Sequence, residues 1–151
     1  MGNSLNDEND ENDENANKAH WSFWVIASIA LIWNALGVAN FFVQMDPEVI
    51  SAYRETEQAI IVGRPAWATG AFAVAVFAGA IGSLLLLLRK SAAIYWFIAS
   101  LIGVVGTMIH ALSVDIEFGA GEIAGIVIMP LAVAALLIWY TKSCQAKGWV
   151  G

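Results

Sequence analysis

The chain has 151 residues, of which 59% are hydrophobic and only 13% are charged. A soluble domain is usually about 45–50% apolar and about 25% charged, and a chain of this length cannot enclose such an excess of apolar surface in a core of its own. The composition therefore excludes an ordinary soluble domain and predicts a membrane protein. Cys144 is the only cysteine, which excludes an internal disulfide, and no basic patch indicates a nucleic-acid partner.

The net charge of −6 belongs to the N-terminal segment. Six of the thirteen carboxylates lie in the first 17 residues, where Asn-Asp-Glu occurs three times in succession, and the other seven are balanced by seven Lys and Arg. A tract without apolar residues and with strong self-repulsion predicts a disordered acidic tail over residues 1–19. We interpret it as a solvated leader, with a docking tail or a weak divalent-cation binder as alternatives. An acidic leader before a long apolar run also argues against a cleaved signal peptide.

Four long apolar runs follow the tail. Each has the ~20 residues that are needed to cross the bilayer as a helix, and none carries a charge in its interior. The predicted fold is an all-α integral membrane four-helix bundle of two transmembrane hairpins, with a tight turn at Arg89-Lys90. The predicted membrane domain covers residues 20–141, with a short C-terminal tail over residues 142–151 and spans at about residues 21–44, 66–88, 92–112 and 121–140.

The Lys and Arg beside the spans predict the orientation of the chain. Five lie on the side of the two termini and the second loop, and two lie in the first loop. Since positive flanks stay inside, the pattern predicts a multi-pass protein of the cell inner (plasma) membrane with both termini in the cytoplasm. The expected partners are the lipid bilayer and either further copies of the chain or a larger membrane complex.

The first outer loop has the pattern of a short amphipathic helix. Asp46 and Pro47 form a typical helix start, and Gly63 and Pro65 can end this helix and begin the second span. One side of the helix is apolar over residues 49–61. We expect it to lie on the outer surface or across the mouth of the bundle.

Polar residues in the first and third spans are the candidate ligand-binding residues. Trp33, Asn34, Asn40 and Gln44 combine an indole with carboxamides, which suits a neutral polyhydroxyl ligand. The alternative is that these side chains hydrogen-bond neighbouring helices. His110 lies near the outer end of span three, where acidic loop residues suggest a metal or proton site. A hydrogen bond to a loop carbonyl is the alternative for this histidine.

Small residues predict the faces on which the helices pack. Their spacing of three or four residues lets helix backbones approach closely, although it does not tell whether the partner helix belongs to the same chain. In span four, Pro130 predicts a kink. The packing candidates are Gly37, Ala75, Gly79, Gly82, Ser83, Gly103 and Gly106.

Several chemistries lack the residues that they need. No nucleophile–base pair, metal-ligand cluster or phosphate-binding glycine loop occurs, so we expect no enzyme, no metal and no cofactor. No carboxylate or base is placed at mid-membrane, where ion-coupled carriers usually have one.

Short motifs along residues 21–149 carry a resemblance. They are Trp33-Asn34 with Gly37, Pro65 with Trp67, the leucine run before Arg89-Lys90, Met129-Pro130-Leu131, Trp139-Tyr140 and Gly148-Trp149. In these motifs the chain resembles a family of small bacterial four-helix inner-membrane proteins that are often labelled sugar transporters. The resemblance implies a transporter-like role, although Lys142 and Lys147 make a sparser basic tail than the family pattern has.

Two functions follow as hypotheses. The first is an uncoupled, transporter-like protein for a small neutral solute such as a sugar or polyol. The second is a non-enzymatic accessory or structural subunit that packs against another membrane protein through the small residues of span two. A polar cavity around Asn34 favours the first, and a dry, fully packed bundle favours the second.

Overall fold

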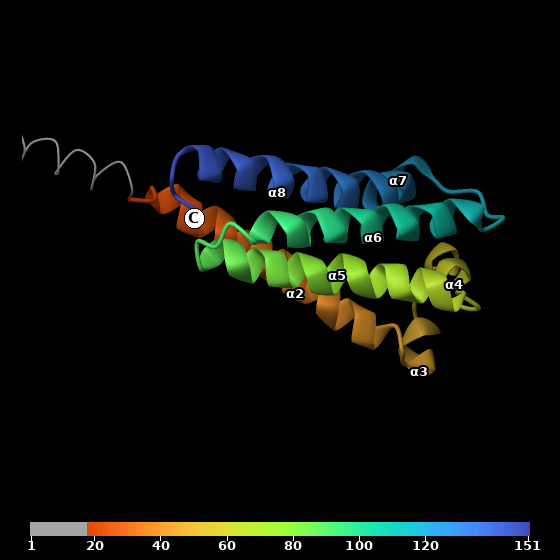
Figure 1. Ribbon diagram of the computed structural model, residues 1–151. Helices are drawn as coiled ribbons and strands as arrows, with labels where there is room; N and C mark the ends of the chain where they lie inside the picture. The colour runs from red at the N-terminus through yellow and green to blue at the C-terminus, as the bar shows by residue number, and fades with distance from the viewer. Residues whose placement is uncertain (1–17) are drawn as a thin grey trace, which may run out of the picture.

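A computed structural model describes residues 18–151, and it is all-α over that range (Figure 1). The described part contains four helices that are long and apolar enough to cross a membrane. This confirms the predicted fold class; the acidic tract that we expect to be disordered lies outside the described residues. The long helices are α2 (Trp21–Val43), α5 (Ala66–Leu87), α6 (Ala93–Ser113) and a fourth span made of α7 (Ala120–Ile123), η1 (Ala124–Ile128) and α8 (Met129–Ala146).

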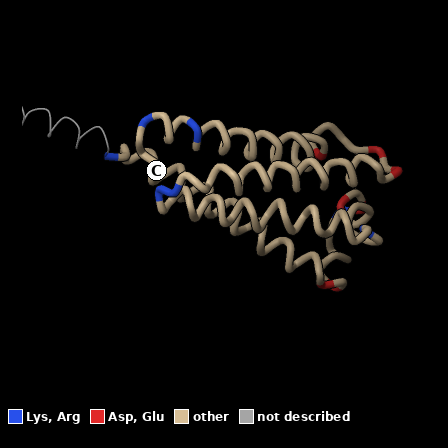
Figure 2. Tube along the Cα trace, viewed as in Figure 1, with Lys and Arg blue, Asp and Glu red and all other residues tan. Residues whose placement is uncertain are grey.

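Charge is distributed unevenly between the two ends of the described chain. Most of the described Lys and Arg residues lie at the end that holds the C-terminus, and the described Asp and Glu residues lie at the opposite end (Figure 2). Between the ends the outward surface is apolar, with Ile29, Leu36 and Ile102 each more than 60% exposed. Side chains of this kind are solvated by lipid rather than water in a spanning helix.

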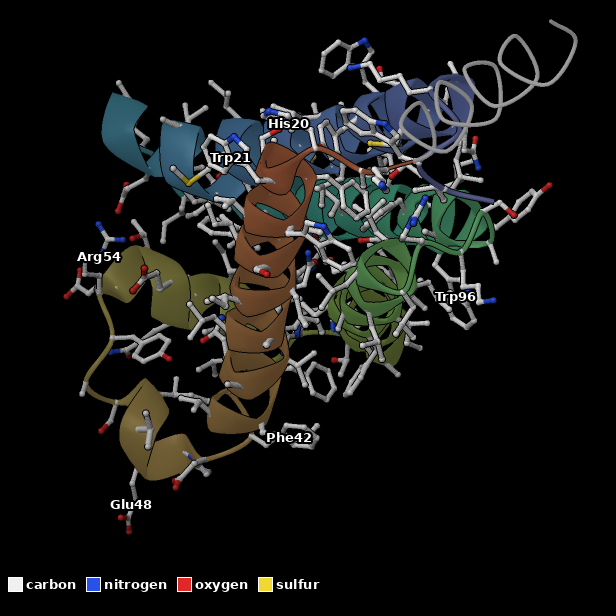
Figure 3. All side chains as sticks on the ribbon, turned by 90° about the vertical axis from the view of Figure 1, so that its left-hand side faces the viewer. His20, Trp21, Phe42, Glu48, Arg54 and Trp96 are labelled. Atoms are coloured by element: carbon white, nitrogen blue, oxygen red, sulfur yellow. The ribbon has the colours of Figure 1, made fainter. Side chains whose placement is uncertain are left out.

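The helices pack in the order α2, α5, α6, α8. The α5–α6 pair is the most extensive contact, α2 packs on α5, and α8 packs on α6. At the end that holds the C-terminus all four long helices meet in one apolar cluster, which includes Phe23, Leu86, Phe97 and Leu137. From there α2 runs away from α8 toward α3 (Pro47–Ile50), as two views at right angles show (Figures 1 and 3). The helices α2 and α8 therefore lie close together at one end of the bundle and diverge toward the other.

The turn between α5 and α6 is the tight turn predicted at Arg89-Lys90. Arg89 adopts a left-handed φ of 59°, and the Lys90 and Arg89 amides donate to the carbonyls of Leu85 and Leu86, which ends α5 as a Schellman motif. That φ costs a non-glycine residue about 1–2 kcal/mol. Contacts with the end of the chain compensate, since Arg89 Nε donates to the Trp149 carbonyl at 2.6 Å and the Gly151 amide donates to the Arg89 carbonyl.

The C-terminal residues pack against the bundle. The last helix continues to Ala146, and a second Schellman turn at Gly148, with φ 69°, then reverses the chain. Val150 is buried and Trp149 packs edge-on near Phe23. This part of the chain therefore covers one end of the bundle. We call it the inner end, and the opposite, acidic end the outer end, after the orientation that the Lys and Arg pattern predicts.

Pro130 is accommodated by a change of helix type. The five residues before Met129 form a π turn, in which the Met129 amide donates to the Ala124 carbonyl five residues back. Proline has no N–H and clashes with the carbonyl four residues before it in an α-helix, and the wider π turn removes that conflict. The fourth span is thus continuous across Pro130, with one widened turn before it.

The first loop confirms the predicted helix start but contains two short helices. Asp46 caps α3, accepting a hydrogen bond from the Glu48 amide, and Pro47 follows at the first position. The chain then breaks before α4 (Glu55–Ile61), because Gln58 Nε2 donates to the carbonyls of Ser51 and Tyr53 and satisfies them outside a helix. Gly63, at φ 75°, and Pro65 then connect α4 to the second span.

Candidate functional site

The predicted packing residues bring α2, α5 and α6 together within one chain. A Cβ on Gly103 would lie 2.7 Å from the Ala71 carbonyl oxygen and 2.8 Å from the Ala75 Cα, and one on Gly82 would lie 2.9 Å from the Phe97 ring. Gly106 meets Ala71 in the same way, and Gly37 lies more loosely against Val76. The small-residue faces are therefore used inside the molecule.

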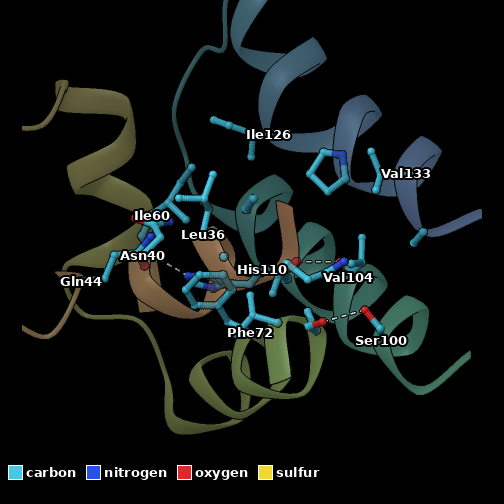
Figure 4. Close-up of a pocket in the computed structure, with 18 of the residues that line it drawn as sticks. Leu36, Asn40, Gln44, Ile60, Phe72, Ser100, Val104, His110, Ile126 and Val133 are labelled. Atoms are coloured by element: carbon cyan, nitrogen blue, oxygen red, sulfur yellow. Dashed lines mark hydrogen bonds between the residues drawn. The ribbon is translucent and has the colours of Figure 1, made fainter. Parts of the chain in front are cut away.

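A cavity of about 610 Å³ lies between the helices, next to this packed interface and toward the acidic end of the bundle. That volume is typical of small-molecule sites, which span about 300–1,000 Å³. Figure 4 shows Asn40, Gln44 and Ile60 on one side of it and Ile126 and Val133 of the last span across from them. All five predicted ligand-binding residues line this cavity: Trp33, Asn34, Asn40, Gln44 and His110.

The lining is apolar at the inner end and polar at the outer end. Phe97 and Leu137 belong both to the cavity wall and to the apolar cluster that closes the bundle, so they form its floor. The outer end is bordered by side chains of α2, α4 and the loop that precedes α5. A ligand in the cavity would thus meet an apolar floor and a polar rim.

Asn34 connects two helices at the edge of the cavity. Its Nδ2 donates to the Ala30 carbonyl at 2.9 Å and to Ser83 Oγ at 3.1 Å, and Ser83 in turn donates to the Gly79 carbonyl. Gly79 allows this contact because a Cβ there would overlap the Asn34 amide oxygen. Asn34 therefore hydrogen-bonds a neighbouring helix, which is the alternative stated for it from the sequence. Its side chain also lines the cavity.

Asn40 and Gln44 connect α2 to the outer loop. Tyr53 donates its hydroxyl to Asn40 Oδ1 at 3.3 Å, and Arg64 Nη1 donates to Gln44 Oε1 at 3.0 Å. The side-chain oxygens of Asn40 and Gln44 therefore accept hydrogen bonds, and their amide nitrogens have no hydrogen-bond partner among residues 18–151. The rim therefore offers N–H donors to a ligand.

His110 is buried, and it bonds a carbonyl rather than an acidic side chain. Its Nε2 donates to the Ile60 carbonyl at 2.9 Å, and its ring packs edge-on against Trp67. In the described part of the chain no three His, Cys, Asp or Glu side chains are grouped as metal ligands. The histidine thus fixes the end of α4 over the cavity, in agreement with the alternative stated for it.

Arg64 is a charged cavity residue that was not among the predicted ligand-binding residues. Its guanidinium lies 5.1 Å from the centre of the Phe72 ring, and its Nε is buried without a hydrogen-bond partner. Burial lowers its pKa from the ordinary arginine value. Arg64 belongs to a loop outside the spans, and only the packing of that loop over the helices shows that it lines the cavity.

A polar latch joins α4 to the start of the last span. Thr56 donates its hydroxyl to Glu122, Arg54 lies 4.0 Å from the same carboxylate, and Arg54 pairs with Glu57 at 2.7 Å. The hydrogen bond and charge of Arg54 hold the pKa of Glu57 below its usual range. The latch places α4 across the outer end of the cavity, which is the second of the two positions predicted for the loop helix.

An apolar groove runs between α2 and α8 and adjoins the cavity. Ile26, Ile29 and Trp33 form one side, and Ala132, Val133 and Leu136 form the other. Trp33 and Val133 also line the cavity. The cavity therefore opens both toward the outer loops and sideways between these two helices.

Comparisons with protein-family models, with curated proteins and with solved structures find no match for the chain. Functional inference therefore depends on the cavity and on the chemistry of its lining.

Proposed function

We propose that the protein is an uncoupled, transporter-like membrane protein that binds a small neutral solute, a sugar or a polyol, in the cavity between α2, α5, α6 and α8. The observation that carries this proposal is the 610 Å³ cavity lined by Trp33 and three carboxamide side chains. An indole face and amide groups are the partners that a polyhydroxyl solute needs.

The proposal of uncoupled transport is supported by the position of the charged residues. The charged side chains that line the cavity are Glu57 and Arg64, and both belong to the outer loop. Ion- and proton-driven carriers usually carry a titratable group inside their spans. Four helices rarely enclose a complete path alone, so transport would use at least two copies of the chain.

The accessory-subunit hypothesis has less support from the packing. It depends on the small residues of α5 as a surface for another membrane protein. Gly79, Gly82 and Ser83 are buried against α2 and α6 of the same chain. A partner would have to displace one of these helices to reach them.

Filling the cavity is expected to stop solute movement. Thr107 lines the cavity and bonds only locally, to the Val104 carbonyl. In sealed vesicles that contain the purified protein, we expect Thr107→Trp to lower the initial uptake of radiolabelled sugars and polyols by at least about tenfold, equivalent to about 1.4 kcal/mol of binding.

Ile109→Trp is the matched control, because Ile109 lies on the same helix but is 60% exposed on the surface of the bundle. This variant should transport like the wild type. Wild-type vesicles that take up no sugar or polyol would contradict the proposal, as would equal inhibition by both tryptophans.

We also propose that the protein resides in the inner membrane with both termini in the cytoplasm, from the distribution of Lys and Arg. Single cysteines in a Cys144→Ser background test this orientation. A cysteine at Glu48, in the first loop, should react with a membrane-impermeant maleimide in intact cells. A cysteine at Lys147 should react only after the membrane is broken. The opposite pattern would reverse the orientation.

A further inference from the structure

The charges around the cavity are not balanced. Of its two charged lining residues, Glu57 is already paired with Arg54 at 2.7 Å. Arg64 has no carboxylate within ion-pair distance in the described part of the chain. A partly buried guanidinium without a counter-charge loses hydration and gains little in return. An anion on this side chain would restore the balance.

The hydrogen-bond donors around Arg64 point to the same kind of ligand. Gln44 and Asn40 use their amide oxygens on Arg64 and Tyr53, which leaves their NH₂ groups to donate elsewhere. Arg64 Nε is itself an unused donor. The N-terminus of α5 follows two residues later and adds a positive partial charge. This end of the cavity thus presents donors and positive charge together.

We infer that Arg64 binds an anionic group, a carboxylate or a phosphate, of the solute in the cavity. The inference rests on the proposed solute cavity, and it replaces the neutral solute of that proposal with one that carries an anionic group. A planar guanidinium binds both groups through paired N–H donors. The Phe72 ring on one side holds the guanidinium in place.

Two sources can supply such a group, and the two openings of the cavity correspond to them. A small acidic polyol would enter from the outer side, past α4. A single-chain acidic lipid would enter through the groove between α2 and α8, with its apolar chain against Val133 and Leu137 and its head at Arg64. The anionic group and its contact with Arg64 are common to both.

The test measures binding of four probes to the full-length chain in phosphatidylcholine nanodiscs by calorimetry. Gluconate and sorbitol differ in the carboxylate, as do decanoate and decanol. We expect the acid of at least one pair to bind about tenfold or more tightly than its neutral partner, and Arg64→Gln to remove that preference, because hydrogen bonds to charged groups contribute by about that factor.

The variants separate charge from structure. Arg64→Lys keeps the charge but loses the planar fork, so it should retain part of the preference. Lys142→Gln is the matched control, since it removes an exposed positive charge that does not line the cavity, and it should leave the preference unchanged. A thermal unfolding scan of each variant checks that it is folded.

Each outcome decides between the proposals. An Arg64-dependent preference for gluconate supports the inference with a soluble solute. A preference for decanoate alone supports it with a lipid and removes the sugar or polyol function. Equal binding of sorbitol and gluconate, unaffected by Arg64→Gln, overturns the inference that Arg64 binds an anion and does not contradict the proposed function. Failure of all four probes to bind the wild type overturns both.

Discussion

Gly103→Val is expected to destabilise the α5–α6 pair more strongly than a valine at Gly37 or Gly106, two other glycines of the packed helix faces. A Cβ at this position would meet the backbone of α5, with the Ala71 carbonyl oxygen at 2.7 Å and the Ala75 Cα at 2.8 Å. Backbone atoms cannot rotate away as a side chain can, so the two helices must separate. Overpacking of this kind costs about 1–3 kcal/mol, and the full valine side chain places this variant at the upper end.

The measurement is reversible unfolding in mixed micelles, with circular dichroism or tryptophan emission as the signal. Gly70→Val is the matched control, because Gly70 lies on α5 with open space around its Cβ position. It should change the free energy of unfolding by less than about 0.5 kcal/mol, as surface substitutions usually do. Equal effects at the two glycines would show that the close approach of α5 and α6 does not determine stability.

The sequence predicts the spans of this fold well because long apolar runs have few alternative structures. A backbone in lipid must satisfy its own hydrogen bonds, and a helix does this within one segment. The helix starts at Pro47 and Ala66 were also predictable, since an aspartate cap and a proline act locally. These features depend on neighbouring residues alone.

Features that depend on distant contacts were harder to predict. A stripe of small residues shows which face of α5 packs closely but not which helix fills it, and Asn34 and Gly103 supply that answer only in three dimensions. The left-handed Arg89 has no local signal, because its conformation is held by Trp149 and Gly151, about sixty residues later. Local propensity for such a turn would favour glycine.

The residues of the candidate site also divide into those that the local sequence predicts and those that depend on distant contacts. Trp33, Asn34, Asn40 and Gln44 were identifiable because polar residues are unusual in a span. Arg64 was not, because arginine at the edge of a membrane is ordinary in sequence. Its role at the cavity follows from the way in which α4 folds back, held by the Thr56–Glu122 bond and by His110. Nothing within a few residues of Arg64 encodes that geometry.

Phe97→Ala is expected to open the cavity toward the inner end of the bundle. Phe97 is 1% exposed, packs against Gly82, and belongs both to the cavity wall and to the apolar cluster in which all four long helices meet. Removing a buried phenylalanine from a soluble core costs about 3–5 kcal/mol. We expect about 3 kcal/mol here, because lipid rather than water solvates the unfolded helices and weakens the transfer term.

The leak of a solute past Phe97 is a second measurement for this variant. If Phe97 separates the cavity from the inner side, Phe97→Ala vesicles should lose an entrapped sugar faster than wild-type vesicles, even though fewer molecules remain folded. Phe97→Leu keeps most of the volume and should lie close to the wild type in both stability and leak. Ile98→Ala, on the exposed side of the same helix, controls for the loss of apolar surface as such. A Phe97→Ala protein that is destabilised but no more permeable would show that the cluster below Phe97 closes the path by itself, with Phe23 and Leu86 as the barrier.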